Sequence, residues 1–452
     1  MRPRWFLLLP IIISGCAPTL SREQARHVVW VDGVGVACDP CRGLVREDPR
    51  VAAAHVVAVV ADLRDAVLAH ARHDGHGLRA VVFIHGGLNS TGIIERRTRD
   101  LHAAMRADGV HPIFINYESG MAGCYGANLR RFGDGAVGLA ASPVALAADV
   151  VRGAVRIPAS ALASTQVLVG RYDRPAGTLA AFDRLSAAPA GGPGGTIVIG
   201  PVRESAWART GRFAGEALVP AHYFTAPFID AVGMPSWDQM RRRARALMQP
   251  PPGRPAAIAE LFAALAADRD ISVASRDGRL ELVLIVHSMG TLLANEVLVA
   301  QPTLRFSEIV YLAAACPIDD VRTLVVPYLA LHGREGSQRA PRFVSVMLHP
   351  LAEANEIMAT AFCPRGSLLV WVDRLFGERQ DGLDRTFGRC DNALESLHVF
   401  PAALRPSVTM HVYGYRTGEP QRHSQFSRSQ TGFWRRDAFT GAVPAGYRSA
   451  RF

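Results

Sequence analysis

Residues 282–294 read LVLIVHSMGTLLA, and the rest of the chain is organised around them. An apolar run of strand length ends at His287, Ser288 follows, and a segment of good helix formers comes next. This order predicts a buried strand, a sharp turn and a helix, an arrangement that exposes a serine oxygen above the edge of a sheet. Gly290 suits the crowded position two residues after the serine, whereas Val286 stands two residues before it, where glycine is expected. Because a serine also commonly begins a helix, the motif needs support from elsewhere in the chain.

A second motif lies about two hundred residues earlier. Residues 80–89 read AVVFIHGGLN, an apolar strand that runs into a glycine turn, and a helical pattern over 91–108 and a strand over 112–117 follow. Strand, helix and strand at this spacing predict a parallel sheet. Glycines in such a turn allow backbone N–H groups to approach a negatively charged oxygen. The expected donors are Gly87 or Leu88 from this turn and Met289 from the residue after the serine.

The alternation of strands and helices extends over most of the chain. Further strands are predicted at 28–31, 308–314, 343–348 and 408–415, and helices at 48–72, at 256–267 and from Ser288 to about 300. Residues 366–373 fit either a helix or an amphipathic loop. Between 119 and 252 the alternation breaks, which predicts a large insertion before the serine strand. It is either a cap or lid over the site or a fixed elaboration, and both readings stay open.

The N-terminus has the features of a secretion signal. Arg2 and Arg4 precede a short apolar run that is too short to span a bilayer, and Gly15 and Cys16 follow. The segment resembles the bacterial lipoprotein signal, which implies that Cys16 carries the lipid and that Ala17 directs the protein to the outer membrane, facing the periplasm. A plain secretion signal and an uncleaved anchor are the alternatives. The expected divisions are the signal at 1–16, a tether and extension at 17–46, the core at 47–118 and 253–435, the insertion at 119–252 and a tail at 436–452.

Composition limits the possible partners. The 452 residues carry a net charge of +10, and all fifty basic residues are arginine. The arginines are scattered apart from 241–243 and form no basic stripe interleaved with aromatics, so nucleic-acid binding is not expected. An anionic membrane surface is a better match for this charge. Cys38 and Cys41 lack both a thioredoxin-like context and the second close pair of a zinc knuckle, which predicts a structural disulfide between them.

Taken together, these features resemble the α/β-hydrolase fold, and specifically bacterial lipase/esterase-like hydrolases of undefined substrate. The residues that carry the resemblance are FIHGGLN at 83–89, HSMG at 287–290 and a late histidine. It covers roughly residues 50–435, interrupted by the insertion. The resemblance implies a mostly parallel central sheet with helices on both faces, and a catalytic serine, acid and histidine in that order along the chain.

This order places the general base after the last strand. His423 follows that strand by about eight residues in a loop-like segment, whereas His411 lies within the strand and is expected to pack there. The acid is expected after the preceding strand, where Glu353 is the first choice and Glu356 the second. Asp319 and Asp320, after an earlier strand, are the rival positions, and Asp373 is a further alternative.

The expected protein is therefore a lipid-anchored serine esterase that works through an acyl-enzyme. Ser288 would attack a small-molecule or lipid ester, His423 would transfer the proton, and no metal or cofactor is implied. Two alternatives stay open. One is a non-catalytic envelope lipoprotein of the same fold that binds a lipid or protein partner, and the other is a transacylase.

Overall fold

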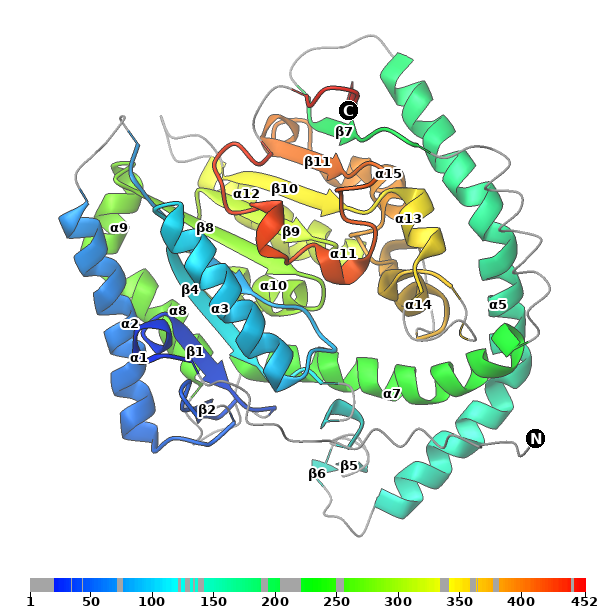
Figure 1. The fold of residues 1–452 in the computed structure, drawn as a ribbon, viewed down its shortest axis with the longest axis horizontal. Coiled ribbons are helices and arrows are strands. Elements are labelled where there is room, and N and C mark those ends of the chain that lie inside the picture. The colour runs from blue at the N-terminus through cyan, green and yellow to red at the C-terminus, as the bar shows by residue number, and fades with distance from the viewer. Residues whose placement is uncertain are drawn as a thin grey trace, which may run out of the picture.

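A ten-stranded sheet occupies the middle of the molecule in the computed structural model (Figure 1). The structure describes residues 20–452 except 34, 43, 71–75, 121–122, 127–130, 133–134, 137–141, 188–193, 204–220, 249–255, 334–340, 358–362, 364, 377–381 and 440–442. The strand order is β12-β7-β11-β10-β9-β8-β3-β4-β1-β2. The strands of this sheet are β1 (Val28–Val31), β2 (Ala37–Cys38), β3 (Leu78–Ile84), β4 (His111–Tyr117), β7 (Thr196–Ile199), β8 (Leu280–His287), β9 (Glu308–Leu312), β10 (Arg342–Met347), β11 (Val408–Val412) and β12 (Arg448–Arg451).

The inner strands are all parallel, and only the edge strands β12 and β2 run antiparallel to their neighbours. Every residue of β3, β4 and β9 is buried. Because successive side chains of a strand point to opposite faces, complete burial means that both faces of the sheet are covered. The predicted α/β architecture with a mostly parallel sheet is confirmed.

Helices surround this sheet. In Figure 1, α2, α8 and α9 lie at the left, the long helix α5 runs along the right, and α7 crosses below the sheet. The segment at 366–373, which fits either a helix or a loop by sequence, contains most of helix α14. The helices are α1 (Arg22–Ala25), α2 (Pro49–Ala69), α3 (Thr91–Ala107), α5 (Ser142–Ala187), α7 (Ala221–Met248), α8 (Ala257–Ala267), α9 (Arg269–Arg276), α10 (Gly290–Ala300), α11 (Ile318–Asp320), α12 (Val326–Gly333), α13 (Pro350–Asn355), α14 (Leu368–Arg374) and α15 (Cys390–Glu395).

Three segments expected outside the core contribute strands to the sheet. The extension at 17–46 supplies β1 and β2, and the tail at 436–452 supplies the edge strand β12. The segment at 119–252 supplies β7, which pairs with β11 and β12, in addition to the small hairpin of β5 (Arg131–Phe132) and β6 (Gly135–Ala136). The proposed divisions at 46, 252 and 435 therefore do not separate the sheet from the rest of the chain. A local pattern cannot show this, because strand pairing joins residues far apart in sequence.

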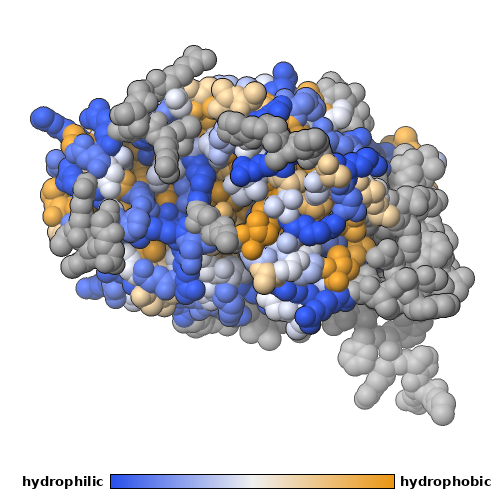
Figure 2. Space-filling view, turned by 90° about the horizontal axis from the view of Figure 1, so that it is seen from above, coloured by the Kyte–Doolittle hydropathy of each residue, from blue (hydrophilic) through white to orange (hydrophobic). Residues whose placement is uncertain are grey.

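The expected disulfide between Cys38 and Cys41 is not formed, and Cys124, Cys316 and Cys390 are also free thiols. The lipoprotein signal with Cys16 lies outside the described residues. Among the helices that the structure describes, none is both long enough and apolar enough to cross a bilayer. One face of the molecule shows mostly hydrophilic residues with smaller hydrophobic groups between them (Figure 2).

Candidate active site

Ser288 lies at a sharp turn between β8 and α10, at the carboxyl edge of the sheet. Its φ is 53°, in the left-handed region that non-glycine residues rarely adopt. The turn is fixed on both sides, since the Ser288 amide donates to the Leu312 carbonyl at 2.8 Å and the Thr291 hydroxyl donates to the Ser288 carbonyl at 2.7 Å. The predicted strand, turn and helix are all present, and the serine stands at the strained position.

His423 meets this serine. Its Nε2 lies 2.7 Å from the Ser288 Oγ, although 135 residues separate the two in sequence. Both residues are buried, with 1% of Ser288 and 5% of His423 exposed. Burial, together with the smaller effect of the nearby Arg97 cation, lowers the pKa of His423 to about 4. The imidazole is therefore neutral near pH 7, as a group that accepts the serine proton must be.

A second histidine, His287, contacts the backbone of His423. The Nε2 of His287 lies 3.1 Å from the His423 carbonyl oxygen, and the two ring centroids are 5.0 Å apart. Burial and the neighbouring His423 lower the pKa of His287 well below its usual value. A neutral His287 then donates to that carbonyl through Nε2. This contact is not predictable from the sequence, where His287 is simply the last residue of the strand.

The glycine turn after β3 lies directly beside the serine. A Cβ built on Gly86 would be 2.8 Å from the His287 Nδ1 and 2.9 Å from the Ser288 Cβ. A Cβ on Gly290 would be 2.7 Å from the His85 carbonyl oxygen. The sharp turn at Ser288 therefore has room because residues 86 and 290 are glycines. Val286 lies within the buried sheet, where it pairs with Ile84 and Tyr311. The departure from glycine at 286 is explained by Gly86, which lies in the turn just after the adjacent strand β3.

We expect Gly86→Ala to disturb both the fold and the site. The added methyl group has no space, so the serine turn must shift, at a cost of about 1–3 kcal/mol in the free energy of unfolding. Gly382→Ala is the matched control, because a Cβ there meets nothing within 4 Å. Denaturant unfolding compares the two variants. Equal stability of Gly86→Ala and Gly382→Ala would contradict the close approach described here.

The Gly86 carbonyl is held away from the serine by three donors. His85 Nδ1 lies 2.7 Å from it, Asn89 Nδ2 donates at 2.7 Å and the Ser119 hydroxyl at 3.3 Å. The Tyr117 amide donates to His85 Nε2, which leaves the proton of a neutral His85 on Nδ1. In a trans peptide the N–H points opposite to the C=O. Anchoring the Gly86 carbonyl therefore directs the Gly87 amide the other way.

The amides of Gly87 and Met289 have no hydrogen-bond partner among the described residues. The two residues are adjacent, since a Cβ on Gly87 would be 2.9 Å from the Met289 Sδ. Two free amides beside a serine oxygen are able to stabilise a negatively charged oxygen. Leu88 does not fit the role that the sequence offered it, because its amide donates to the Ser119 carbonyl at 2.8 Å.

The structure does not bring Glu353 to His423. Its carboxylate lies 3.4 Å from Arg389 Nε, and Arg389 also bonds to Asp373 and Asp391 at 2.7 Å each. Burial raises the pKa of Glu353 to about 8. This buried ion network takes up Glu353 and the alternative Asp373.

Glu356, the second choice, is the carboxylate that touches the histidine. Both of its oxygens accept from the His423 backbone N–H, at 3.0 Å and 2.9 Å. Glu356 is 6% exposed, and burial raises its pKa to about 7. The His423 Nδ1 is buried and has no hydrogen-bond partner among the described residues. The Glu356 carboxylate thus contacts the same residue whose Nδ1 needs an acceptor.

The rival aspartates have other contacts. Asp319 pairs with Arg322 at 2.6 Å on the exposed side of α11, and Asp320 accepts from Asn295 at 3.3 Å. Both follow β9, whereas His423 follows β11. Among the described contacts, neither aspartate reaches His423.

A pocket opens next to the two free amides. It has a volume of about 140 Å³ and is lined by Gly87, Leu88, Gly233, Ser236, Trp237, Met240, Met289, Leu368, Trp371 and Phe376. Helix α7, from the 119–252 segment, supplies one wall, and α14 with Phe376 supplies another. Nearly all of these side chains are apolar, as is usual for a site that holds a hydrocarbon group.

The chain has no match among protein families, among characterised proteins or among solved structures.

Proposed function

We propose that this protein is a serine hydrolase of the α/β-hydrolase type that cleaves a carboxylic ester. The observation that carries the proposal is the 2.7 Å contact between His423 Nε2 and Ser288 Oγ at a strained turn on the carboxyl edge of a parallel sheet. Ligand sites of such sheets lie at this edge. A serine that meets a neutral histidine beside two free amides has the parts that acyl transfer requires.

The reaction follows from these contacts. Ser288 Oγ attacks the ester carbonyl carbon while its proton moves to His423 Nε2, and the amides of Gly87 and Met289 hold the resulting oxyanion. The alcohol leaves with the proton from His423, which forms the acyl-enzyme. Water then loses a proton to His423, attacks the acyl carbon and releases the acid, and the proton returns to Ser288.

Glu356 is the proposed acid of this site. When Nε2 accepts the serine proton, Nδ1 carries the other ring proton and needs an acceptor. The Glu356 carboxylate already lies 2.9 Å from the backbone nitrogen of the same residue. In this proposal the Glu356 side chain turns from the backbone N–H to Nδ1 during the reaction and stabilises the imidazolium that forms there.

A fluorophosphonate probe tests the proposal, because it reacts covalently with an activated serine. We expect labelling of the wild type and no labelling of Ser288→Ala. Ser345→Ala is the matched control, since Ser345 is a buried serine of β10 whose hydroxyl has no described partner, and it should label like the wild type. If the folded wild type in detergent does not react, the non-catalytic alternative replaces this proposal.

The apolar pocket supports an ester with a short hydrocarbon acyl group. Its volume of about 140 Å³ is close to that of an engineered protein cavity that holds benzene, so it accommodates roughly six carbons. The lining residues Gly87 and Met289 are also the proposed oxyanion donors, so an acyl group bound in this pocket would lie next to the reacting carbonyl. The segment at 119–252 contributes one wall of this pocket through α7, as a substrate-shaping cap would.

A series of p-nitrophenyl esters tests the pocket. We expect kcat/KM to be highest for acyl groups of about four to six carbons. Trp371→Ala enlarges the pocket and should raise the ratio of long-chain to short-chain kcat/KM by about tenfold or more. Ser236→Ala, a small change in the α7 wall of the same pocket, is the control and should leave the ratio unchanged. An unaltered chain-length profile in Trp371→Ala would show that the acyl group binds elsewhere.

The envelope location is part of the same proposal. A lipid-anchored esterase in the periplasm would reach esters at or near the membrane surface, which agrees with the net charge of +10. Incorporation of radiolabelled palmitate, lost in Cys16→Ser, tests the anchor.

A further inference from the structure

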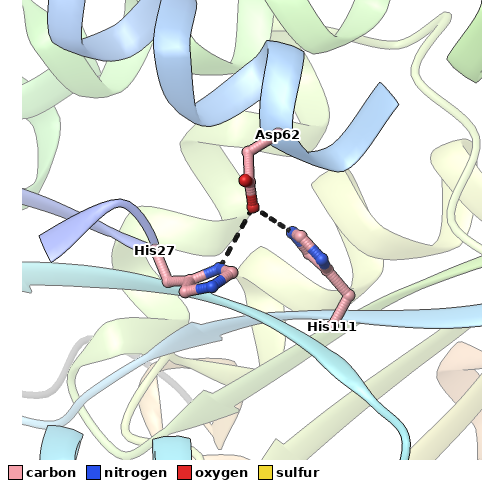
Figure 3. Close-up of side chains that lie close together, drawn as sticks. All are labelled: His27, Asp62 and His111. Atoms are coloured by element: carbon pink, nitrogen blue, oxygen red, sulfur yellow. Dashed lines mark ion pairs between the residues drawn. The ribbon is translucent and has the colours of Figure 1, made fainter. Parts of the chain in front are cut away.

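A second group of polar side chains lies at the opposite edge of the sheet, remote from the serine. His27 directly precedes β1, His111 is the first residue of β4, and Asp62 lies on α2. Strands β1 and β4 are parallel neighbours, so both histidines stand at the amino ends of their strands. Figure 3 shows the two rings below Asp62, whose carboxylate points between them.

The three residues converge on one point. The Asp62 Oδ2 lies 3.7 Å from His27 Nδ1 and 3.7 Å from His111 Nε2, and the three ligand atoms all lie within 4.8 Å of one another. Atoms bound to one zinc ion at about 2.0–2.1 Å in tetrahedral geometry are about 3.4 Å apart. The two distances from Asp62 are thus within a few tenths of an ångström of ligand spacing, and they are too long for direct hydrogen bonds.

Several ring nitrogens of these histidines have no hydrogen-bond partner among the described residues. His111 is 2% exposed, and neither of its ring nitrogens has a hydrogen-bond partner among the described residues. His27 Nδ1 is likewise buried and unpartnered, and the His27 ring hydrogen-bonds to the Pro112 backbone. Buried polar atoms are almost always satisfied, so several orphaned nitrogens around one point indicate a missing ligand.

A third histidine stands beside the group. His102 on α3 is buried, its ring centroid lies 5.0 Å from that of His27, and its Nε2 is also unpartnered among the described residues. Burial of His102 and of His111 removes both imidazoles from water, so a bound ion would give their unpartnered nitrogens a partner. Neutral imidazole is the form that binds metal.

We propose that His27, Asp62 and His111 bind a divalent transition-metal ion of the zinc type. Two imidazoles and one carboxylate suit Zn²⁺, whereas Mg²⁺ and Ca²⁺ prefer oxygen ligands alone. The fourth position would be filled by water or by the neighbouring His102. The ion joins α2 to two strands at the edge opposite to Ser288, so its role is structural and it takes no part in acyl transfer.

Zinc binding to the apo-protein tests this inference. The full mature chain, freed of any histidine tag and treated with EDTA, should bind one equivalent of Zn²⁺ in a calorimetric titration. At a hundredfold excess over Kd the melting temperature should rise by roughly 3 °C. Co²⁺ should give visible bands of a nitrogen- and oxygen-ligated ion without thiolate charge transfer. No binding and no shift in melting temperature for the wild type would overturn the proposal.

Matched variants identify the ligands. Asp62→Asn is the main variant, because the Asp62 side chain is 36% exposed and its replacement should leave the fold intact by circular dichroism. It should lose at least tenfold in zinc affinity and most of the shift in melting temperature. His398→Gln removes an exposed histidine and should bind like the wild type. Loss of binding in Cys41→Ser with retention in Asp62→Asn would assign the ion to the thiols and overturn the proposal.

Discussion

Replacing His423 with alanine is expected to lower kcat for ester hydrolysis by about 10⁴- to 10⁶-fold. The reason is the 2.7 Å contact with Ser288 Oγ, since a serine hydroxyl without a base is almost unreactive at neutral pH. The remaining rate would come from the amides of Gly87 and Met289 and from substrate binding. Steady-state and single-turnover kinetics on a short p-nitrophenyl ester measure the loss.

His398→Ala is the control for this measurement. His398 is an exposed histidine whose ring contacts only the nearby Glu395 carbonyl among the described residues, so its loss should change kcat less than twofold. A drop of less than tenfold in His423→Ala would exclude His423 as the base.

The second large effect separates two glutamates that are three positions apart. Glu356→Gln should lower kcat by about 10³- to 10⁴-fold, because an amide cannot stabilise the imidazolium that forms on His423. Glu353→Gln should leave kcat within a few-fold of the wild type and instead lower the free energy of unfolding, since its carboxylate pairs with the buried Arg389. Kinetics and denaturant unfolding on the same two variants test both statements. The reverse pattern would restore Glu353 as the acid.

The pH dependence of activity is a second test of whether Glu356 is the acid. The active form needs neutral His423 and ionised Glu356, whose pKa values are lowered to about 4 and raised to about 7. Activity is therefore lost as the pH falls from about 7 to about 4. The apparent pKa values of this loss belong to the coupled pair and not to either residue alone. In Glu356→Gln the acidic limb of kcat/KM should move toward pH 4. A limb that stays at its wild-type position would show that Glu356 does not take part.

The sequence predicts the central strands and the serine turn well, because hydrophobic period and glycine position are local signals. Ser288 and His423 meet as expected, since the ends of parallel strands share one edge of the sheet. Which carboxylate contacts His423 is harder to predict from the sequence. Glu353 lies within the short helix α13 and Glu356 just after its end, and only the position of Arg389, far along the chain, determines which carboxylate is left for His423.

Long-range pairing also sets the limits of the prediction elsewhere. Strands β7 and β12 come from segments that read as insertion and tail. β7 joins the sheet by pairing with β11, which lies far along the chain, and β12 joins it by pairing with β7. Val286 presents the same difficulty in one residue. Its tolerance depends on Gly86 of the adjacent strand end, which no pattern around position 286 can reveal.

The left-handed backbone at Ser288 has a consequence for how this protein responds to selection. The described non-glycine residues with positive φ are Leu88, Ser288 and Ala313, which follow the neighbouring strands β3, β8 and β9. Each conformation costs of the order of 1–3 kcal/mol, and glycine would relieve it. A screen for thermostability alone would therefore favour glycine at these positions and remove the nucleophile at one of them. Selection for stability alone would therefore act against the residue on which the proposed activity depends.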